Sequence, residues 1–448
     1  MNATVPADMQ RALAALRERP LSPTDKGLGS LAASRLISTS TLADLRPCLF
    51  GPDFVFPLLV VREDALQANI AAMAAWCAAS GVRLAPHGKT TMAPQIIARQ
   101  IAAGAWAVTA ATIAQVQVLR AFGVRRVLLA NELTDQSGID WLAAELAADP
   151  DFDVYVYVDS IAGTEMLDER LRASWQRGSG RQPRRLPVLI ELGLVGGRTG
   201  CRSVAQAVDV AKAAAATSTL RVAGAAGFEG NIGHDDEPAT LAAITRFCRD
   251  LRSLGEQLPP PDASAGPLIL SAGGSAFFDI VVRELTIGAG TGTGQLTPTV
   301  VLRSGAYVTH DHGFYARIAP GPGPSSSPGR SGPVLTPALE LWAPVLSRPE
   351  PTLAIACAGR RDAPFDQGMP VPIRLRCADG QMPDATGIRV TAMDDQHAYL
   401  AVPPDRPLGP GDLVCLGISH PCTALDKWRV IPVVDDDYRV TDAIHTFF

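Results

Sequence analysis

Three short stretches of the sequence hold residue types that could carry chemistry. The first is PHGKTTM at residues 86–92, where Lys89 closes an apolar run that is typical of a strand. Partial burial at a strand end disfavours the charged ammonium, so it lowers the pKa of the amine and makes it a better nucleophile toward a carbonyl carbon. Lysine is also scarce, with four residues against 36 arginines. Lys89 is therefore a candidate nucleophile, and the alternative is a lysine at the rim of the fold that pairs with a carboxylate.

Two glycine-rich stretches could hold a phosphate group. They are GGRTG at residues 196–200 and AGGS at residues 272–275, and each follows a predicted strand. Backbone N–H groups in such turns can cradle a phosphate, above all where a helix begins next. Barrel enzymes often bind phosphate late in the strand order, which favours Gly273, Gly274 and Ser275. The alternative is that these glycines serve only the geometry of the loops.

The third stretch pairs a histidine with a cysteine. His420 and Cys422 lie two residues apart in SHPCTALDKW, at the end of a predicted strand, so on an extended backbone they project to the same side. Imidazole nitrogen and thiolate sulfur are ligands that Zn²⁺ prefers, and two protein ligands suit an open, catalytic site better than a closed one. Three other histidines follow predicted strands and are expected to be hydrogen-bonded residues of the rim: His234, His310 and His312.

The elements that would position these residues are eight apolar runs in the first two thirds of the chain. They begin near residues 57, 82, 104, 125, 153, 186, 221 and 267, and alanine-rich helical segments separate them. Continuous apolar runs are typical of strands that are buried on both faces. Eight strand–helix units over about 250 residues match a (β/α)8 barrel of the α/β class, in which the residues after each strand meet at one mouth. An open doubly wound sheet is the alternative, but no GxGxxG turn follows the first run.

The periodicity changes after a stretch rich in proline, glycine and serine. Beyond this stretch, short strand-like pieces follow one another with turn signals between them, which predicts a C-terminal all-β domain. We therefore divide the chain into an N-terminal extension at 1–24, a segment at 25–56 that pattern alone does not place, a barrel at 57–317, a linker or loop at 318–333, and a β-domain at 334–448.

Composition narrows the class of protein. The chain has 448 residues, of which 47% are hydrophobic and 19% are charged, with a formal net charge of −5. The hydrophobic fraction excludes wholesale disorder, and the mildly acidic balance argues against a nucleic-acid binder. No run of eighteen apolar residues is present, so we expect no membrane span. Eight scattered cysteines without a CxxC pair, and an N-terminus without a signal-peptide pattern, favour a cytoplasmic protein.

Taken together, the motifs resemble those of a known family. PHGKTTMAPQ, ELGLVGGRTG, GFEG, AGGS, LRSGAYVTHD and SHPCTALDKW follow one another as in the D-serine dehydratase/D-threonine aldolase-like family, and the resemblance is closest to its bacterial amino-acid deaminase-like branch. Members of this family are fold-type III pyridoxal 5'-phosphate (PLP) enzymes related to bacterial alanine racemase. The resemblance therefore implies a barrel followed by a β-domain, to which the segment at 25–56 would contribute, and a homodimer.

The resemblance also implies roles for individual residues. Lys89 stands where the family places the lysine that binds the cofactor covalently, and His87 belongs to the same motif. His420 and Cys422 match the metal pair of the dehydratases, which usually holds zinc. Relatives often carry a tyrosine near the pyridine nitrogen at the position of Phe228, and phenylalanine offers no hydrogen bond there. The other residues implied at the cofactor are Arg198 near the phenolic oxygen and, around the phosphate, Gly273, Gly274, Ser275, Gly305, Ala306 and Tyr307.

The implied activity is that of an ammonia-lyase acting on a small-molecule D-amino acid. A D-3-hydroxy amino acid such as D-serine would lose its α-proton to Lys89 and its hydroxyl with the help of the metal, giving a 2-oxo acid and ammonia. The nearest alternative is retro-aldol cleavage of the D-threonine aldolase type. Aldolases tend to show His-x-Asp with harder metals, so Cys422 favours the dehydratase.

Three other functions remain as alternatives. A racemase needs a second base, but neither Tyr399 nor Tyr438 lies in a racemase-like motif. A PLP-binding protein without catalytic activity, or a barrel used only as a binding module, would leave the lysine and the His-x-Cys pair without a role. The sequence does not indicate which D-3-hydroxy amino acid is preferred.

Overall fold

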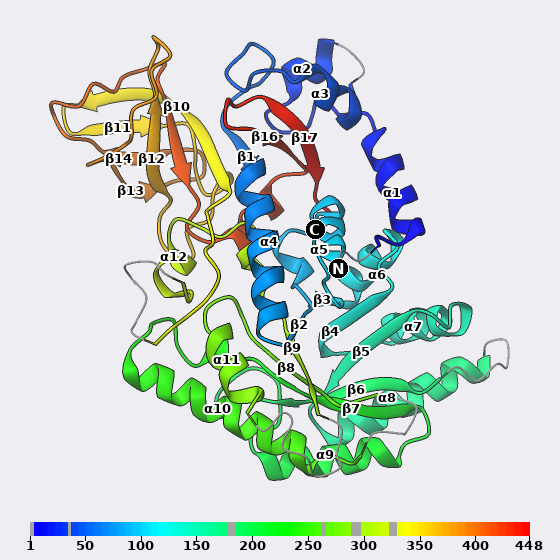
Figure 1. The fold of residues 1–448 in the computed structure, drawn as a ribbon. Helices are drawn as coiled ribbons and strands as arrows, with labels where there is room; N and C mark the ends of the chain where they lie inside the picture. Colours follow the sequence, from blue (N-terminus) through cyan, green and yellow to red (C-terminus); the bar gives the residue numbers. More distant parts are fainter. Residues whose placement is uncertain (1–3, 35–36, 178–183, 261–265, 288–296, 322–328) are drawn as a thin grey trace.

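Two sheets organise the chain, and Figure 1 shows them one above the other. The computed structural model describes residues 4–34, 37–177, 184–260, 266–287, 297–321 and 329–448. The first sheet is a parallel barrel, and the second is a mixed sheet built mostly from the C-terminal quarter of the chain. Both parts of the predicted fold class, the α/β barrel and the separate C-terminal β-domain, are confirmed. No helix among the described residues is long and apolar enough to cross a membrane.

The barrel consists of eight parallel strands in the order β2-β9-β8-β7-β6-β5-β4-β3. Its strands are β2 (Arg83–Leu84), β3 (Val108–Ala110), β4 (Arg126–Glu132), β5 (Asp153–Val158), β6 (Leu186–Leu192), β7 (Leu220–Gly227), β8 (Ile269–Ala272) and β9 (Thr299–Leu302). The ends of this order meet beyond β2, where His87 forms a parallel bridge with Thr109. The Trp106 N–H also donates to the Leu84 carbonyl at 2.7 Å, so the sheet closes on itself.

Helices cover the outside of the barrel. They are α4 (Glu63–Ala79), α5 (Pro94–Ala102), α6 (Ile113–Ala121), α7 (Gln136–Ala148), α8 (Ile161–Arg177), α9 (Val204–Ala216), α10 (Pro238–Gln257) and α11 (Phe278–Leu285). Side chains at their first residues define where several of them begin: Thr112, Asp135 and Ser203 each accept a hydrogen bond from an N–H of the first helical turn. Such caps satisfy N–H groups that have no partner within the helix.

One predicted barrel strand belongs to the other sheet. β1 (Leu58–Arg62) pairs antiparallel with β10 (Leu339–Glu350) and parallel with β16 (Val430–Val434), so the prediction that the run near residue 57 begins the barrel is wrong. The eighth barrel strand is instead β9, which we did not predict as a strand. Both segments are short apolar runs, and periodicity does not indicate which of two sheets buries such a run.

The second sheet joins the two ends of the chain. Its central order is β13-β14-β11-β10-β1-β16-β17, and β15 and β12 extend it from β10. The remaining strands are β11 (Leu353–Ala356), β12 (Val371–Arg376), β13 (Arg389–Met393), β14 (Ala398–Ala401), β15 (Leu413–Gly417) and β17 (Val440–His445). Residues before β1 also pack on it, since the Leu49 N–H donates to the Tyr438 carbonyl and the Val440 N–H to the Pro47 carbonyl. In Figure 1, blue β1 accordingly lies beside red β16 and β17.

Short helices complete the chain on either side of these sheets. They are α1 (Ala7–Arg17), α2 (Gly29–Ser34) and α3 (Thr39–Leu45) near the N-terminus and α12 (Phe314–Ile318) after the barrel. α1 packs against the barrel through Met9, whose backbone lies so close to Gly123 that a β-carbon there would come within 2.6 Å of the Met9 nitrogen. Much of the predicted linker, residues 322–328, lies outside the described residues.

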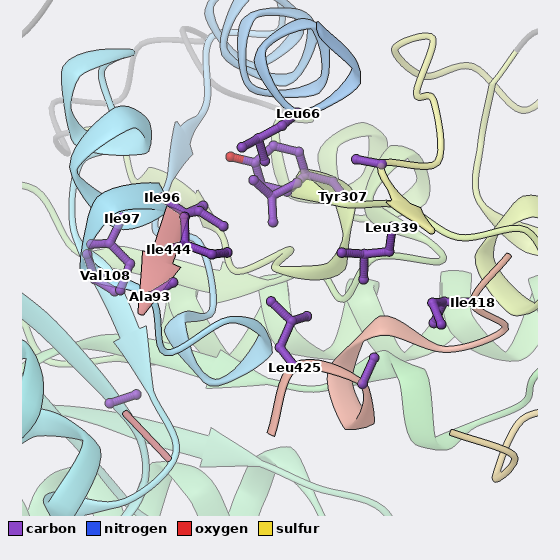
Figure 2. Packing of buried hydrophobic residues seen from close by; sticks show 14 of the residues in the cluster. Leu66, Ala93, Ile96, Ile97, Val108, Tyr307, Leu339, Ile418, Leu425 and Ile444 are labelled. Atoms are coloured by element: carbon purple, nitrogen blue, oxygen red, sulfur yellow. The ribbon is translucent and has the colours of Figure 1, made fainter. Parts of the chain in front are cut away.

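A continuous apolar core connects the two domains. Figure 2 shows Tyr307 and Leu66 from the barrel layer close to Leu339 and Leu425 from the β-domain. These residues belong to one cluster of buried side chains. Because burial of apolar side chains is the main favourable contribution to folding, this shared core holds the barrel mouth against the C-terminal sheet.

Candidate functional site

A cavity of about 530 Å³ lies between the barrel mouth and the β-domain. Residues that follow barrel strands form one wall, and Gln367, His420 and Cys422 contribute from the β-domain. Eleven of the twelve predicted site residues line it: His87, Lys89, Arg198, Phe228, Gly273, Gly274, Ser275, Gly305, Ala306, His420 and Cys422. The tertiary structure therefore collects residues that are separated by more than 300 positions in the sequence.

Tyr307 is the predicted site residue that does not line the cavity. Its ring is buried in the apolar core beside Leu66, as Figure 2 shows, and its hydroxyl accepts a hydrogen bond from Gln100 Nε2 at 2.9 Å. It lies in the short 3₁₀ turn Ala306–Val308, in which neighbouring side chains point in different directions. Ala306 lines the cavity and the Tyr307 ring lies in the core, so any contact of Tyr307 with the cofactor would have to come from its backbone.

Lys89 occupies the 3₁₀ turn Gly88–Thr90, directly beyond β2. Burial lowers the pKa of its amine, and the nearby guanidinium groups of Arg198 and Arg303 lower it further, while Cys422 acts in the opposite direction. A lowered pKa increases the fraction of neutral amine, which is the nucleophilic form. The environment that the sequence suggested for this lysine is thus present in the structure.

His87 precedes Lys89 by two residues and supplies a neutral imidazole to the same wall. Burial lowers its pKa well below the usual range, and the charges of Lys89 and Arg303 add to this effect. Its Nδ1 atom is buried and has no hydrogen-bond partner among the described residues. A buried nitrogen without a partner is costly, so this atom is suited to a polar group of a bound molecule.

Three cationic side chains surround the cavity. Arg303 is buried, and its guanidinium donates to Ser271 Oγ at 2.7 Å and to the Gly227 carbonyl at 2.6 Å, both neutral oxygens. Together with Lys89 and Arg198 it gives this side of the cavity positive charge. Positively charged side chains attract a ligand of the opposite sign, so this side of the cavity suits an anionic group.

Glu229 accepts hydrogen bonds from two of the backbone N–H groups that we predicted to bind phosphate, those of Gly273 and Gly274. Its buried carboxylate accepts hydrogen bonds from Gly273 N at 3.0 Å and from Gly274 N at 2.7 Å. Among the described residues, the N–H groups of Ser275 and Gly305 have no such partner. A phosphate in this corner would therefore bind at Ser275 and Gly305 rather than at the two glycines before them.

Arg198 and Phe228 form a pair at the edge of the cavity. The guanidinium carbon of Arg198 lies 4.8 Å from the centre of the Phe228 ring, within the range of a cation–π interaction. Arg202 donates to the carbonyls of Gly197 and Arg198 and so holds the backbone of this loop. A β-carbon at Gly274 would come within 2.9 Å of the ring, which explains why glycine is needed beside Phe228.

His420 and Cys422 face the cavity from the turn that follows β15. His420 Nδ1 lies 2.7 Å from Asp366 Oδ2, and the hydroxyl of Thr423 donates to the other oxygen of the same carboxylate. This contact orients the ring and leaves Nε2 as the nitrogen that can bind a metal. Burial lowers the pKa of His420, but the interactions with Cys422 and Asp366 outweigh it and raise the pKa to about 9. The donor set, an imidazole held by a carboxylate and a sulfur beside an open cavity, fits zinc.

The barrel wall of the cavity, which carries Lys89, contacts the β-domain wall, which carries His420 and Cys422. Thr90 Oγ1, next to Lys89, lies 3.6 Å from Cys422 Sγ. Tyr315, from α12, also reaches the Cys422 sulfur with its buried hydroxyl, and burial raises the pKa of this phenol. The Lys89 amine and the His420–Cys422 pair, which could bind a soft metal, therefore face the same part of the cavity.

Several of these residues were not predicted from the sequence. Glu229 and Arg303 belong to motifs that we quoted, GFEG and LRSGAYVTHD, and their charge within an apolar context was an available signal. Tyr315 follows the histidines of THDHGFY and could have been found in the same way. Asp366 comes from a loop without any pattern, so only the folded chain shows that it supports His420.

Comparison with known proteins identifies the family. The model of the alanine racemase N-terminal domain matches residues 61–281, and that of the putative serine dehydratase domain matches residues 338–434. A D-threonine aldolase from Arthrobacter sp. is 24% identical over 351 residues, which cover 78% of this chain and 80% of the aldolase. The chain belongs to the D-serine dehydratase/D-threonine aldolase-like family.

Solved structures support the same family fold. The D-threonine aldolase from Filomicrobium marinum superposes with a TM-score of 0.69 at 24% identity, covering 88% of this chain and 95% of the aldolase. The D-threo-3-hydroxyaspartate dehydratase from Delftia sp. HT23 gives a TM-score of 0.65 at 20% identity and covers 88% of this chain and 97% of the dehydratase. The family fold is therefore the alanine racemase-like, fold-type III arrangement of barrel and β-domain.

Proposed function

We propose that this protein is a PLP-dependent, zinc-assisted ammonia-lyase that converts D-3-hydroxy amino acids such as D-serine to a 2-oxo acid and ammonia. The observation that carries the proposal is the contact between the two walls, in which Thr90 Oγ1 lies 3.6 Å from Cys422 Sγ beside Lys89. Elimination of water from such a substrate needs a base at the α-carbon and an acid at the neighbouring hydroxyl. Lys89 offers the base on one side of the cavity, and a metal bound by His420 and Cys422 would offer the acid on the other.

The residues of the barrel wall fit a phosphorylated, aromatic cofactor. PLP bound at Lys89 would supply an electron sink for the charge that develops at the α-carbon. Lys89 is placed to take the α-proton, because its lowered pKa leaves more of the amine neutral near pH 7. Arg303 and Arg198 offer positive charge to the phosphate, the phenolic oxygen or the substrate carboxylate, and His87 offers a neutral nitrogen with no other partner.

The residues of the β-domain wall fit a Lewis-acid metal. Zinc held by His420 Nε2 and Cys422 Sγ would polarise the substrate hydroxyl and so stabilise the leaving hydroxide. Asp366 keeps the imidazole in the orientation that this binding requires. The hydroxyl of Tyr315, which contacts the Cys422 sulfur, lines the same side of the cavity. A D-threo-3-hydroxyaspartate dehydratase of similar fold has been solved as a cysteine-to-alanine mutant in a metal-free form, which supports a role of Cys422 in metal binding.

Retro-aldol cleavage is the second candidate function. The relatives include D-threonine aldolases and a 3-hydroxy-D-aspartate aldolase from Paracoccus denitrificans, so family membership does not choose between the two reactions. Cys422 is the residue that favours elimination, because sulfur selects a softer metal than a carboxylate does. We also propose a homodimer in the cytoplasm, on the family resemblance and on the cysteine usage.

The deciding experiment is a product assay on a panel of D- and L-3-hydroxy amino acids, with and without zinc. D-Threonine should yield 2-oxobutanoate and ammonia, the activity should disappear on chelation, and zinc should restore it. Glycine and acetaldehyde as the products would replace the proposal with the aldolase. Bound PLP without turnover of any member of the panel would replace it with a non-catalytic PLP-binding protein.

A further inference from the structure

A second group of side chains that could bind a metal lies at the barrel mouth, and its three residues do not line the cavity that holds His420 and Cys422. Glu132 ends β4, Asp159 directly follows β5, and Glu191 lies near the end of β6. One carboxylate oxygen from each residue lies within 4.8 Å of the oxygens from the other two. The three strands are neighbours in the sheet, so their carboxyl ends bring these groups together.

Strand register directs the three side chains into the barrel. Glu132 pairs with Tyr157 across β4 and β5, and Tyr157 is buried in the small cluster that fills the barrel interior. Asp159 follows Tyr157 by two residues and therefore projects to the same face. Glu191 pairs with Ala226, another member of that interior cluster.

Four polar atoms at this point have no hydrogen-bond partner among the described residues. They are both carboxylate oxygens of Glu132, Oε2 of Glu191 and the hydroxyl of Tyr157, and all of them are buried. Tyr157 is only 2% exposed, and the nearby charges of Glu191 and Glu132 raise the pKa of its hydroxyl, in addition to the effect of burial. Glu132 and Glu191 contact each other, but the buried Tyr157 hydroxyl beside them has no partner among the described residues, which suits this point to a bound ligand.

We infer that Glu132, Asp159 and Glu191 form a binding site for a hard divalent cation of the size of Ca²⁺. Calcium takes oxygen ligands at about 2.3–2.6 Å, so two oxygens on opposite sides of the ion lie roughly 4.6–5.2 Å apart. The three oxygens lie within 4.8 Å of one another, so one ion between them could contact all three. Oxygen donors without sulfur or nitrogen select a hard cation, whereas His420 and Cys422 select a softer one.

The charge balance of the group favours the same ligand. Three carboxylates lie together at this point, so their mutual repulsion favours a bound cation. Arg303 and Arg198 are near enough to act on the charge of the Tyr157 hydroxyl. A divalent ion would balance the negative charge of the three carboxylates directly.

The bound ion would stabilise the loop that carries Arg198. The Gly200 N–H donates to Asp159 Oδ2 at 3.0 Å, so a cation on Asp159 would hold both the carboxylate and the backbone of this loop. The site would thus hold the loop that carries Arg198, a predicted cofactor contact.

The test measures binding of Ca²⁺ and of Tb³⁺, a luminescent ion of similar size, to the His420→Ala/Cys422→Ser double variant of the full chain. Tb³⁺ beside Tyr157 should emit when tyrosine is excited, and Ca²⁺ should quench this emission by competition. Glu132→Gln and Glu191→Gln should each weaken Ca²⁺ binding about tenfold or more, since affinity follows the number of charged ligands. Glu169→Gln, an exposed substitution on α8 with the same change of charge, should leave binding unchanged.

The outcomes separate this site from the proposed function, because no step of the measurement requires PLP or turnover. Absence of Ca²⁺ and Tb³⁺ binding at millimolar concentration would overturn the inference, as would equal affinity in Glu132→Gln and in the parent. If Glu191→Gln does not fold, the partly exposed Glu132→Gln and a Tyr157→Phe variant with reduced Tb³⁺ emission decide the question.

Discussion

The barrel wall and the β-domain wall of the cavity hold their functional groups in different ways. On the barrel wall, Lys89 lies in a turn directly beyond a strand, and Arg303 is buried with two hydrogen bonds. On the β-domain wall, His420 lies in a turn after β15 and depends on Asp366, a side chain that is 43% exposed and 54 residues away. Lys89 and His420 both follow strands, so the walls differ in how exposed their supporting groups are: Arg303 is buried, whereas Asp366 is partly exposed.

This difference matches the two kinds of ligand that we propose. A cofactor that is attached covalently and retained through many turnovers suits a rigid strand end, because its position must not vary. A metal ion that binds through two side chains and accepts a substrate oxygen suits a more open position. Loss of Lys89 on the barrel wall should therefore abolish both PLP binding and turnover. Loss of His420 on the β-domain wall should reduce turnover but leave PLP binding intact.

The largest effect is expected for Lys89→Met. Turnover should fall by about 10³-fold or more, and the long-wavelength absorbance of bound PLP should disappear, because the variant lacks both the attachment point and the base. Lys212→Met is the matched control, since Lys212 is exposed on α9 and forms a surface ion pair with Asp209. Retention of both the absorbance and the turnover in Lys89→Met would show that the barrel wall does not have this role.

His420→Ala should give the next largest effect and separate the two walls. Zinc content should fall and turnover should decrease by about 10²-fold, because the Lewis acid is lost, while the PLP absorbance should persist. The comparison variant is His397→Ala, whose side chain is exposed in a turn of the β-domain. Simultaneous loss of PLP would mean that the walls act as one unit, and unchanged zinc content would place the metal elsewhere.

Asp366→Asn should have a smaller effect of the same kind. Loss of the carboxylate behind a metal-binding histidine typically costs about 10- to 100-fold in metal affinity, because the ring is no longer oriented and its basicity drops. Competition with a coloured chelator measures this affinity directly, without an activity assay. Asp437→Asn, exposed on the turn before β17, controls for the lost charge. Equal zinc affinity in the two variants would limit Asp366 to a structural role.

The smallest effect concerns the stability of the PLP-free protein. Burial lowers the pKa of Lys89 in the folded state, so the folded protein is destabilised at pH values at which the amine is charged in the unfolded chain. Lys89→Met should raise Tm by about 1–3 °C at pH 7. The gain should shrink as pH approaches the unfolded lysine pKa of about 10.4, because both states then lose the charge. A gain that does not vary with pH would show that methionine acts through packing alone.

Much of the architecture and of the site could be predicted from the sequence. Seven of the eight runs that we predicted as barrel strands are barrel strands, because continuous apolar runs between helical segments are a local property of the chain. The short β-domain strands β10 to β15 were predictable from their spacing and turns in the same way. Lys89, His420 and Cys422 could be recognised because lysine and the His-x-Cys pattern are scarce in this sequence. Each of them also follows a predicted strand, which is visible from the sequence alone.

The tertiary structure decided what depends on residues far apart in the chain. Membership of β1 in the second sheet, the direction of the Tyr307 ring and the capture of Gly273 and Gly274 by Glu229 all follow from packing between elements. The same holds for Asp366 behind His420 and for the carboxylate group of Glu132, Asp159 and Glu191. Local periodicity determines which face of an element is buried, but the neighbour that covers this face is chosen only when the chain folds.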